Sequence, residues 1–172
     1  MSNSAPKRLI AALMVAVSLG GLSGCGFALR GTTDHALQIT PAFANVSISL
    51  EDTPTAFALK SPLTQQLQLV GVHTGTTSQN HIDIKNVRFR RFELVSTLTE
   101  VRQVLMADVS YTLIKDGKAV TVSSPLQVEH SYQHNEASVV TGDQQGERVQ
   151  AWLYDALAQR IAEQYRTHAL AN

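Results

Sequence analysis

The feature of the sequence that most constrains its fold is a pair of alternating segments joined by Asp116 and Gly117. Upstream, "VRQVLMADVSYTLI" (residues 101–114) has an apolar side chain at nearly every second position, with Gln103 as the exception. Downstream, "AVTVSSPLQVEHSY" (residues 119–132) is a second β-prone segment with Ser, Thr, His and Gln among its polar positions. Alternation with period two is typical of a strand with one buried face, and Asp-Gly between two such segments is a specific signal for a two-residue hairpin. The chain is therefore expected to build its core on a β-sheet.

Further strands are predicted upstream of this hairpin. Residues 46–50 alternate between apolar and polar side chains, as do residues 81–95. In the second segment the apolar parity shifts across Asn86, as it does at a β-bulge. Pro125 has no N–H to donate to a sheet ladder, so the last strand is expected at an edge of the sheet or bulged at this point.

A first helix is predicted where apolar residues recur at helical spacing over residues 59–70, just before Gly71. Pro62 leaves two alternatives for its start. Either the helix begins near Thr55 and bends at Pro62, or it is short, with Ser61 as its cap and Pro62 at its first position. The shorter helix is slightly favoured.

The last element is predicted to be a helix with Asp143 as its N-cap. Its apolar positions form one stripe that is expected to be buried: Val149, Trp152, Leu153, Ala156, Leu157 and Ile161. The order of elements is strand-helix-strand-strand-strand-helix. This order favours an α+β domain, with two helices packed on one face of a mostly antiparallel four-stranded sheet.

The amino terminus has the pattern of a bacterial lipoprotein signal. Lys7 and Arg8 precede an uncharged segment, residues 9–22, which as a helix would reach about 21 Å against a hydrocarbon core of roughly 30 Å. Residues 22–25 read Leu-Ser-Gly-Cys, which resembles the lipobox that precedes an acylated cysteine. Cys25 is the only cysteine, so no disulfide can form within the chain. We expect Cys25 to be the lipid attachment point, carrying S-diacylglycerol and N-acyl groups, rather than a buried structural or catalytic thiol.

These observations divide the chain into four parts. They are a cleaved signal peptide (1–24), a lipidated tether (25–45), an α+β domain (46–168) and a short tail (169–172). The mature chain would hold 12 basic and 14 acidic residues, a balance that does not indicate nucleic-acid binding.

Motifs for catalysis are absent from the sequence. It contains no G-x-S-x-G, no glycine-rich phosphate loop and no C-x-x-C. His130 and His134 have a spacing that suits a metal only on a helix, and they fall on a strand end and a loop. We expect them to be solvent-facing polar residues, and we expect neither an enzyme nor a cofactor beyond the acyl groups.

One basic cluster stands out, "KNVRFRRFE" at residues 85–93. It is either a solvated strand face or an anion site, because arginine forks match phosphate and carboxylate geometry. Period-two geometry places Arg88 and Arg90 on the open face of the sheet and directs Arg91 toward the helices. For a protein tethered in a cell envelope, the nearest abundant phosphates belong to lipids.

Several stretches resemble the lipopolysaccharide-assembly lipoprotein family LptE of Gram-negative bacteria. They are "GCGFALRGT" (24–32), "LTQQLQLVGV" (63–72), the Asp116-Gly117 hairpin and "GDQQGERVQAWLYDALAQRIAEQY" (142–165). The resemblance implies a lipoprotein of the outer membrane that sits as a plug inside the β-barrel protein LptD. It also implies that the chain helps that barrel assemble, binds lipopolysaccharide and assists its insertion into the outer leaflet.

The chain departs from the family in one respect. Basic residues at the sheet tip and in the loop before the last helix are tied to lipopolysaccharide contact in the family, but residues 93–97 and 133–145 contain no Lys or Arg. Lipopolysaccharide binding would then use polar groups or the arginines Arg88, Arg90, Arg91 and Arg102, or it would be weak. The alternative functions are a free-standing, periplasm-facing lipoprotein that binds another ligand or client protein, and a lipoprotein hydrolase.

Overall fold

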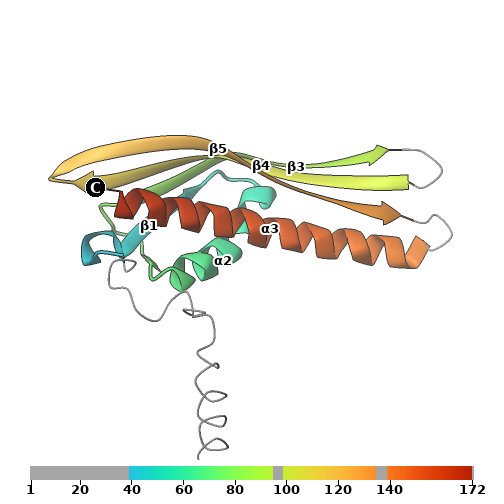
Figure 1. The fold of residues 1–172 in the computed structure, drawn as a ribbon, viewed down its shortest axis with the longest axis horizontal. Coiled ribbons are helices and arrows are strands. Elements are labelled where there is room, and N and C mark those ends of the chain that lie inside the picture. The colour runs from blue at the N-terminus through green and yellow to red at the C-terminus, as the bar shows by residue number, and fades with distance from the viewer. Residues whose placement is uncertain (1–38, 95–98, 135–138, 172) are drawn as a thin grey trace, which may run out of the picture. The chain divides into compact units, whose positions relative to one another are not determined.

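A five-stranded mixed sheet carries two helices on one of its faces (Figure 1). The computed structural model describes residues 39–94, 99–134 and 139–171. The strands lie in the order β2-β1-β3-β4-β5, and β1 is parallel to both of its neighbours while β3, β4 and β5 are antiparallel. The elements are β1 (Asn45–Leu50), β2 (His73–Thr74), β3 (His81–Leu94), β4 (Thr99–Lys115), β5 (Lys118–His134), the 3-10 helix η2 (Pro41–Phe43), and the helices α2 (Pro54–Leu69) and α3 (Val139–Leu170).

The predicted α+β class is confirmed, but the description of a mostly antiparallel sheet of four strands needs correction. The two residues of β2 are too few to show a period in the sequence. The chain leaves β1, crosses over through α2 and returns as β3, and such a crossover joins parallel strands. The antiparallel part of the sheet is the meander from β3 to β5.

The hairpin between β4 and β5 has the predicted two-residue turn. Asp116 and Gly117 have φ angles of 50° and 74°, the positive values that a type I′ turn requires at both central positions. Lys115 pairs with Lys118 directly beside the turn. β5 is an edge strand, which explains how Pro125 is accommodated without an N–H.

The predicted bulge in β3 is also confirmed, and Glu51 holds it in place. Asn86 has a φ of 53°, and the register with β4 shifts between Lys85 and Arg88. The Glu51 carboxylate accepts hydrogen bonds from the backbone N–H groups of Asn86 and Val87, at 2.8 Å each. The residue directly after β1 thus binds the N–H groups that the bulge removes from the ladder.

Replacing Glu51 by alanine is expected to lower the free energy of unfolding by about 1–2 kcal/mol, because two backbone N–H groups lose a charged acceptor. Urea denaturation followed by circular dichroism measures the change. Asp52 is its exposed neighbour, and Asp52→Ala is expected to stay within about 0.5 kcal/mol of the original chain. Equal losses in the two variants would contradict the role given to Glu51.

The helix α2 begins at Pro54, so the longer of the two predicted helices is correct and the favoured shorter one is wrong. Thr53 is its N-cap, and its Oγ1 accepts a hydrogen bond from the N–H of Ala56 at 3.2 Å. Pro62 lies inside the helix. The reason is burial. Ala56 and Leu59, in the two turns before Pro62, are fully buried, so packing keeps these turns helical despite the proline.

The helix α3 begins at Val139, so Asp143 lies inside the helix. The prediction that Asp143 is the N-cap is therefore wrong. The strands explain the greater length. β4 and β5 have 17 residues each, or about 56 Å, and the 32 residues of α3 span about 48 Å, so the helix runs along most of the hairpin. No helix among the described residues is both long enough and apolar enough to span a membrane.

The buried face of α3 differs from the predicted stripe at one important position. Leu153, Leu157 and Ile161 are fully buried, but 49% of Trp152 is exposed. Trp152 lies at the margin of the stripe, on the side of the edge strand, where its ring contacts that of His130. In the part of the chain that the structure describes, no strand lies beyond β5 to cover it, so the prediction that Trp152 belongs to the core is wrong.

The folded region extends beyond residues 46–168 at both ends. Phe43 and Ala169 are both buried in the core, and α3 continues to Leu170. The Tyr165 hydroxyl donates a hydrogen bond to the carbonyl oxygen of Phe43 at 2.8 Å, which fixes η2 against α3. Burial raises the pKa of Tyr165 well above its usual range, so this donor keeps its proton. Part of the predicted tether is therefore packed against the domain.

Candidate functional site

The face of the sheet that the helices leave uncovered brings three of the predicted arginines together. In the register of β3 with β4, Arg88 pairs with Met106, Arg90 with Val104 and Phe92 with Arg102. Directly paired residues point to the same side of a sheet, and the intervening residues of β4 (Gln103, Leu105 and Ala107) are buried on the helix side. Arg88, Arg90 and Arg102 therefore share the open face, and we call them the arginine cluster.

Arg91, the fourth predicted residue, lies on the opposite side of the sheet. It pairs in register with Gln103, which is buried beneath α3. Its guanidinium forms an ion pair with Glu93 at 3.1 Å. The parity argument made from the sequence is thus confirmed, and Arg91 does not belong to the arginine cluster.

The side chains of the arginine cluster are exposed, and none of the three forms an ion pair with another described residue. The ion pairs near the cluster join other residues, Lys85 to Asp83 at 2.6 Å and Arg91 to Glu93. Arg88 and Arg90 are two residues apart, or about 6.6–7 Å along the strand. Glu129 pairs in register with Val104 and so lies on the same face, but it forms no ion pair with the cluster. Three exposed cations against one carboxylate leave this part of the face positive and suited to binding an anion from outside.

Apolar side chains lie among these arginines. Phe92 is 45% exposed, whereas Val104 is only 4% exposed although no helix covers it. The long side chains beside Val104 must shield it, and its neighbours on this face include Arg90 and Arg102. The open face therefore offers positive charge and apolar surface side by side.

A shallow hollow of about 360 Å³ adjoins the cluster at the bulge in β3. Asn86 and Arg88 line it from β3, Met106 and Asp108 from β4, and Pro125 and neighbouring residues from β5. The Asn86 side-chain amide donates a hydrogen bond to Asp108 at 2.8 Å. The bulge thus shapes a polar depression next to one of the three guanidinium groups.

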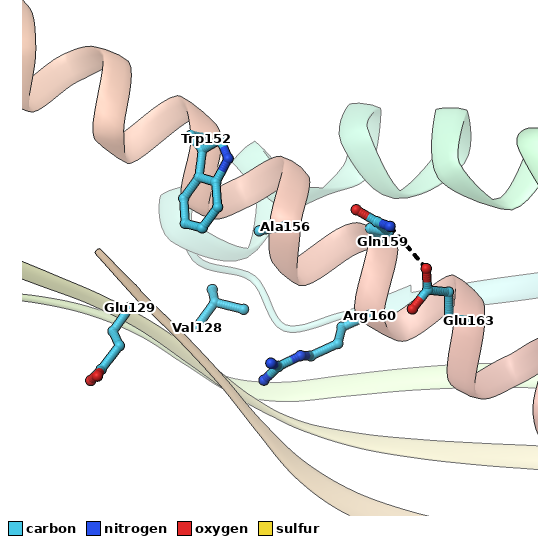
Figure 2. Close-up of a pocket in the computed structure, with 7 residues that line it drawn as sticks. All are labelled: Val128, Glu129, Trp152, Ala156, Gln159, Arg160 and Glu163. Carbon is cyan, nitrogen blue, oxygen red and sulfur yellow. Dashed lines mark hydrogen bonds between the residues drawn. The ribbon is translucent and has the colours of Figure 1, made fainter. Parts of the chain in front are cut away.

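The sequence did not predict a second concave site, a groove of about 290 Å³ between β5 and α3 (Figure 2). Trp152 stands at one end of it, and Arg160 reaches from α3 toward β5, where it donates a hydrogen bond to the carbonyl oxygen of Gln127 at 2.6 Å. The groove was missed because Trp152 was expected in the core. The residues lining it are Val128, Glu129, Trp152, Ala156, Gln159, Arg160 and Glu163.

The other predicted site residues are placed as follows. His130 lies on β5 with its ring 5.1 Å from that of Trp152, and within the described ranges no three His, Cys, Asp or Glu residues are grouped as a metal site would need. The side chain of His134 and all of Cys25 lie outside the described part of the chain. Acylation of Cys25 therefore stays a prediction from the sequence.

No protein-family model and no curated protein sequence matches the chain. Several solved structures of bacterial lipoproteins match it. A minor lipoprotein from Acinetobacter baumannii is 26% identical, with a TM-score of 0.63, over 73% of this chain and 92% of that one. The uncharacterized lipoprotein B from Nitrosomonas europaea is 16% identical, with a TM-score of 0.63, over 86% of this chain and 94% of that one.

The rare lipoprotein B from Shewanella oneidensis is also similar, with 14% identity and a TM-score of 0.58 over 72% of this chain and 95% of that one. At these identities the Nitrosomonas and Shewanella structures show a shared fold, and the Acinetobacter protein adds a likeness in sequence. Each of them is covered almost completely, so the likeness concerns whole lipoprotein domains. The described part of the chain thus has the fold of small bacterial lipoproteins.

Proposed function

We propose that the chain is an outer-membrane lipoprotein, anchored through acylated Cys25, that acts with the β-barrel protein LptD in lipopolysaccharide transport. In this role it plugs the barrel, helps it assemble and assists the insertion of lipopolysaccharide into the outer leaflet. Three observations support the proposal: the lipobox at residues 22–25, the sequence stretches that resemble the LptE family, and the fold shared with bacterial lipoproteins.

The observation that carries the lipopolysaccharide part of the proposal is the arginine cluster. Lipopolysaccharide presents phosphate groups beside acyl chains. Arginine binds phosphate through paired N–H groups, and the apolar surface of Phe92 beside Arg90 and Arg102 can contact hydrocarbon. The cluster compensates for the missing basic residues at 93–97 and 133–145, because it places three guanidinium groups on a nearby part of the same sheet.

The remainder of the open face supports the role of a plug. Toward the hairpin turn, hydroxyl groups pair across β4 and β5, Ser110 with Ser123 at 2.8 Å and Thr112 with Thr121 at 3.0 Å. The inner wall of a membrane β-barrel is polar, whereas its outer wall is apolar. A polar sheet face without a helix on it is suited to contact with such an inner wall.

The double variant Arg88→Glu/Arg90→Glu is expected to weaken lipopolysaccharide binding by the purified protein about tenfold or more, because phosphate meets carboxylate instead of guanidinium. The loss is expected to be larger at low salt, where charges act over longer distances. Titration with fluorescently labelled lipopolysaccharide at two salt concentrations measures both effects.

The matched control is Arg91→Glu/Arg148→Glu, which changes the net charge equally. Arg91 lies on the helix side of the sheet and Arg148 is exposed on α3, so this variant is expected to keep most of the affinity. Equal losses of lipopolysaccharide affinity in both double variants would show that only the net charge matters, and would contradict a binding role for the arginine cluster. Intact lipopolysaccharide binding together with poor recovery of the barrel would show instead that the cluster contacts the barrel wall.

A further inference from the structure

Along β5, the backbone N–H and C=O groups of successive residues point alternately toward β4 and away from it. In a two-residue hairpin the flanking pair, here Lys115 and Lys118, exchanges both hydrogen bonds, so odd-numbered residues of β5 point their N–H and C=O groups away from β4. Two independent observations agree with this parity. Pro125 is odd-numbered, so its nitrogen faces outward, where no hydrogen bond to β4 is lost. The carbonyl of Gln127, also odd-numbered, accepts a hydrogen bond from Arg160 on the side away from β4.

Beyond Gln127, the outward groups of Glu129 and Ser131 are available. Over the described residues, no hydrogen bond occupies the outward N–H or C=O of either residue, and the outward N–H of Gln127 is also unused. Arg160 occupies the Gln127 carbonyl and thereby marks one end of the free edge. Such a row of unpaired backbone groups is a template for another strand.

This free edge runs along the groove that α3 closes on its other side. Trp152 and Ala156 line the groove from the helix, and Val128, which faces the helices, lines it from the strand (Figure 2). The ring of Trp152 meets that of His130 nearly edge-on, at 69°, and half of its surface stays exposed. The end of the groove formed by Trp152, Ala156 and Val128 is therefore apolar, and it lies beside outward-facing backbone groups that recur at every second residue of β5.

We propose that an extended segment of another polypeptide binds here as a strand added to β5. Its backbone pairs with Gln127, Glu129 and Ser131, and an apolar side chain on its helix-facing side enters the groove beside Trp152. On the open face, the residue opposite Glu129 is basic or carries a hydroxyl, because opposite charges pair favourably across strands. A saccharide could stack on Trp152, but it would not require the outward N–H groups at alternate residues. The proposal does not depend on the role in lipopolysaccharide transport.

The test is selection of nine-residue peptides from a displayed random library on the full chain, purified in detergent. We expect selected peptides to carry apolar residues at alternate positions. A selected peptide, made by synthesis, is expected to bind the variants Ser131→Pro and Trp152→Ala about tenfold more weakly than it binds the original chain. A tenfold loss corresponds to about 1.4 kcal/mol of binding free energy. Isothermal titration measures the affinities, and circular dichroism checks that the variants fold.

The matched control for the proline is Ser123→Pro, at the same parity of the same strand but outside the groove, which is expected to leave binding unchanged. A second control is in the peptide. N-methylation of the residues that face β5 is expected to abolish binding, and N-methylation of the alternate residues is expected to spare it.

Three results would overturn the proposal. The first is that no selected peptide binds with a dissociation constant below about 1 mM, which corresponds to a binding free energy of about 4.1 kcal/mol. The second is binding that responds to Trp152→Ala but neither to Ser131→Pro nor to N-methylation, as expected of a platform for saccharides or single side chains. The third is a dimer of the chain that Ser131→Pro dissociates, which would make a second copy the occupant.

Discussion

Leu157→Ala is expected to lower the free energy of unfolding by about 2–5 kcal/mol, the range for deleting most of a buried leucine side chain. Leu157 is fully buried on α3, one turn from Leu153 and one from Ile161. The cavity would open inside the hydrophobic core, where Leu157 belongs to the buried cluster. Urea denaturation of the purified protein, followed by far-ultraviolet circular dichroism, measures the loss.

The matched control on the same helix is Trp152→Ala. Because 49% of Trp152 is exposed and it lies over the edge strand, we expect this variant to lose only about 1 kcal/mol despite its larger side chain. The order of the two effects is the informative result. If Trp152→Ala loses as much free energy of unfolding as Leu157→Ala, or more, the indole ring belongs to the core. Trp152 would then not form an exposed wall of the groove.

Cys25→Ala is expected to abolish lipid attachment and to leave an unprocessed precursor held in the membrane by residues 9–22. The thiol is the only group in the chain that could form the thioether to diacylglycerol. Stable anchoring takes more than one acyl chain, and a cysteine with both S-diacylglycerol and N-acyl groups meets this requirement. The expected loss of lipid-anchored protein is therefore complete, and what stays in the membrane is the unprocessed precursor.

Mass spectrometry of the mature amino terminus tests this prediction. In the original chain we expect a first residue Cys25 that carries the acyl groups, and in Cys25→Ala a full-length precursor without them. Cys25→Ser is the conservative control, because it keeps the size of the residue while removing the thiol, and it is expected to behave like the alanine variant. An unmodified Cys25, or cleavage at another peptide bond, would contradict the lipoprotein assignment.

The strands of the meander could be predicted well because their signals are local. The Asp116-Gly117 turn requires two positive φ angles, and the parity shift at Asn86 reports a bulge directly in the pattern of apolar residues. The same parity placed Arg88 and Arg90 on one face and Arg91 on the other. Each of these inferences depends on residues that are neighbours in the sequence.

The incorrect predictions concern features that depend on tertiary packing. Pro62 is tolerated inside α2 because the helix is buried on both sides of it, which no local pattern shows. The strand β2 exists only because β1 offers it a parallel partner. Trp152 fits the helical stripe by its spacing, but its exposure is decided by β5 being the last strand of the sheet.

The groove between β5 and α3 could not be predicted for the same reason. Its residues come from two elements that are adjacent in sequence, but the direction in which α3 crosses the hairpin decides whether they enclose a space. The only local signal was a large aromatic residue at the margin of an apolar stripe. Such a residue can cover a core, as we had expected of Trp152, or form the wall of a binding site.

The central proposal, that the chain is the lipoprotein subunit of a lipopolysaccharide translocon, is tested most directly by affinity isolation from solubilised outer membranes. The tag is placed at the carboxyl terminus of the full chain, so that the signal and Cys25 stay intact. We expect a β-barrel protein to be recovered in a one-to-one ratio with the chain, in detergent and after washing with high salt. Recovery of the chain alone, with no stoichiometric barrel partner, would contradict the account and favour a free-standing lipoprotein.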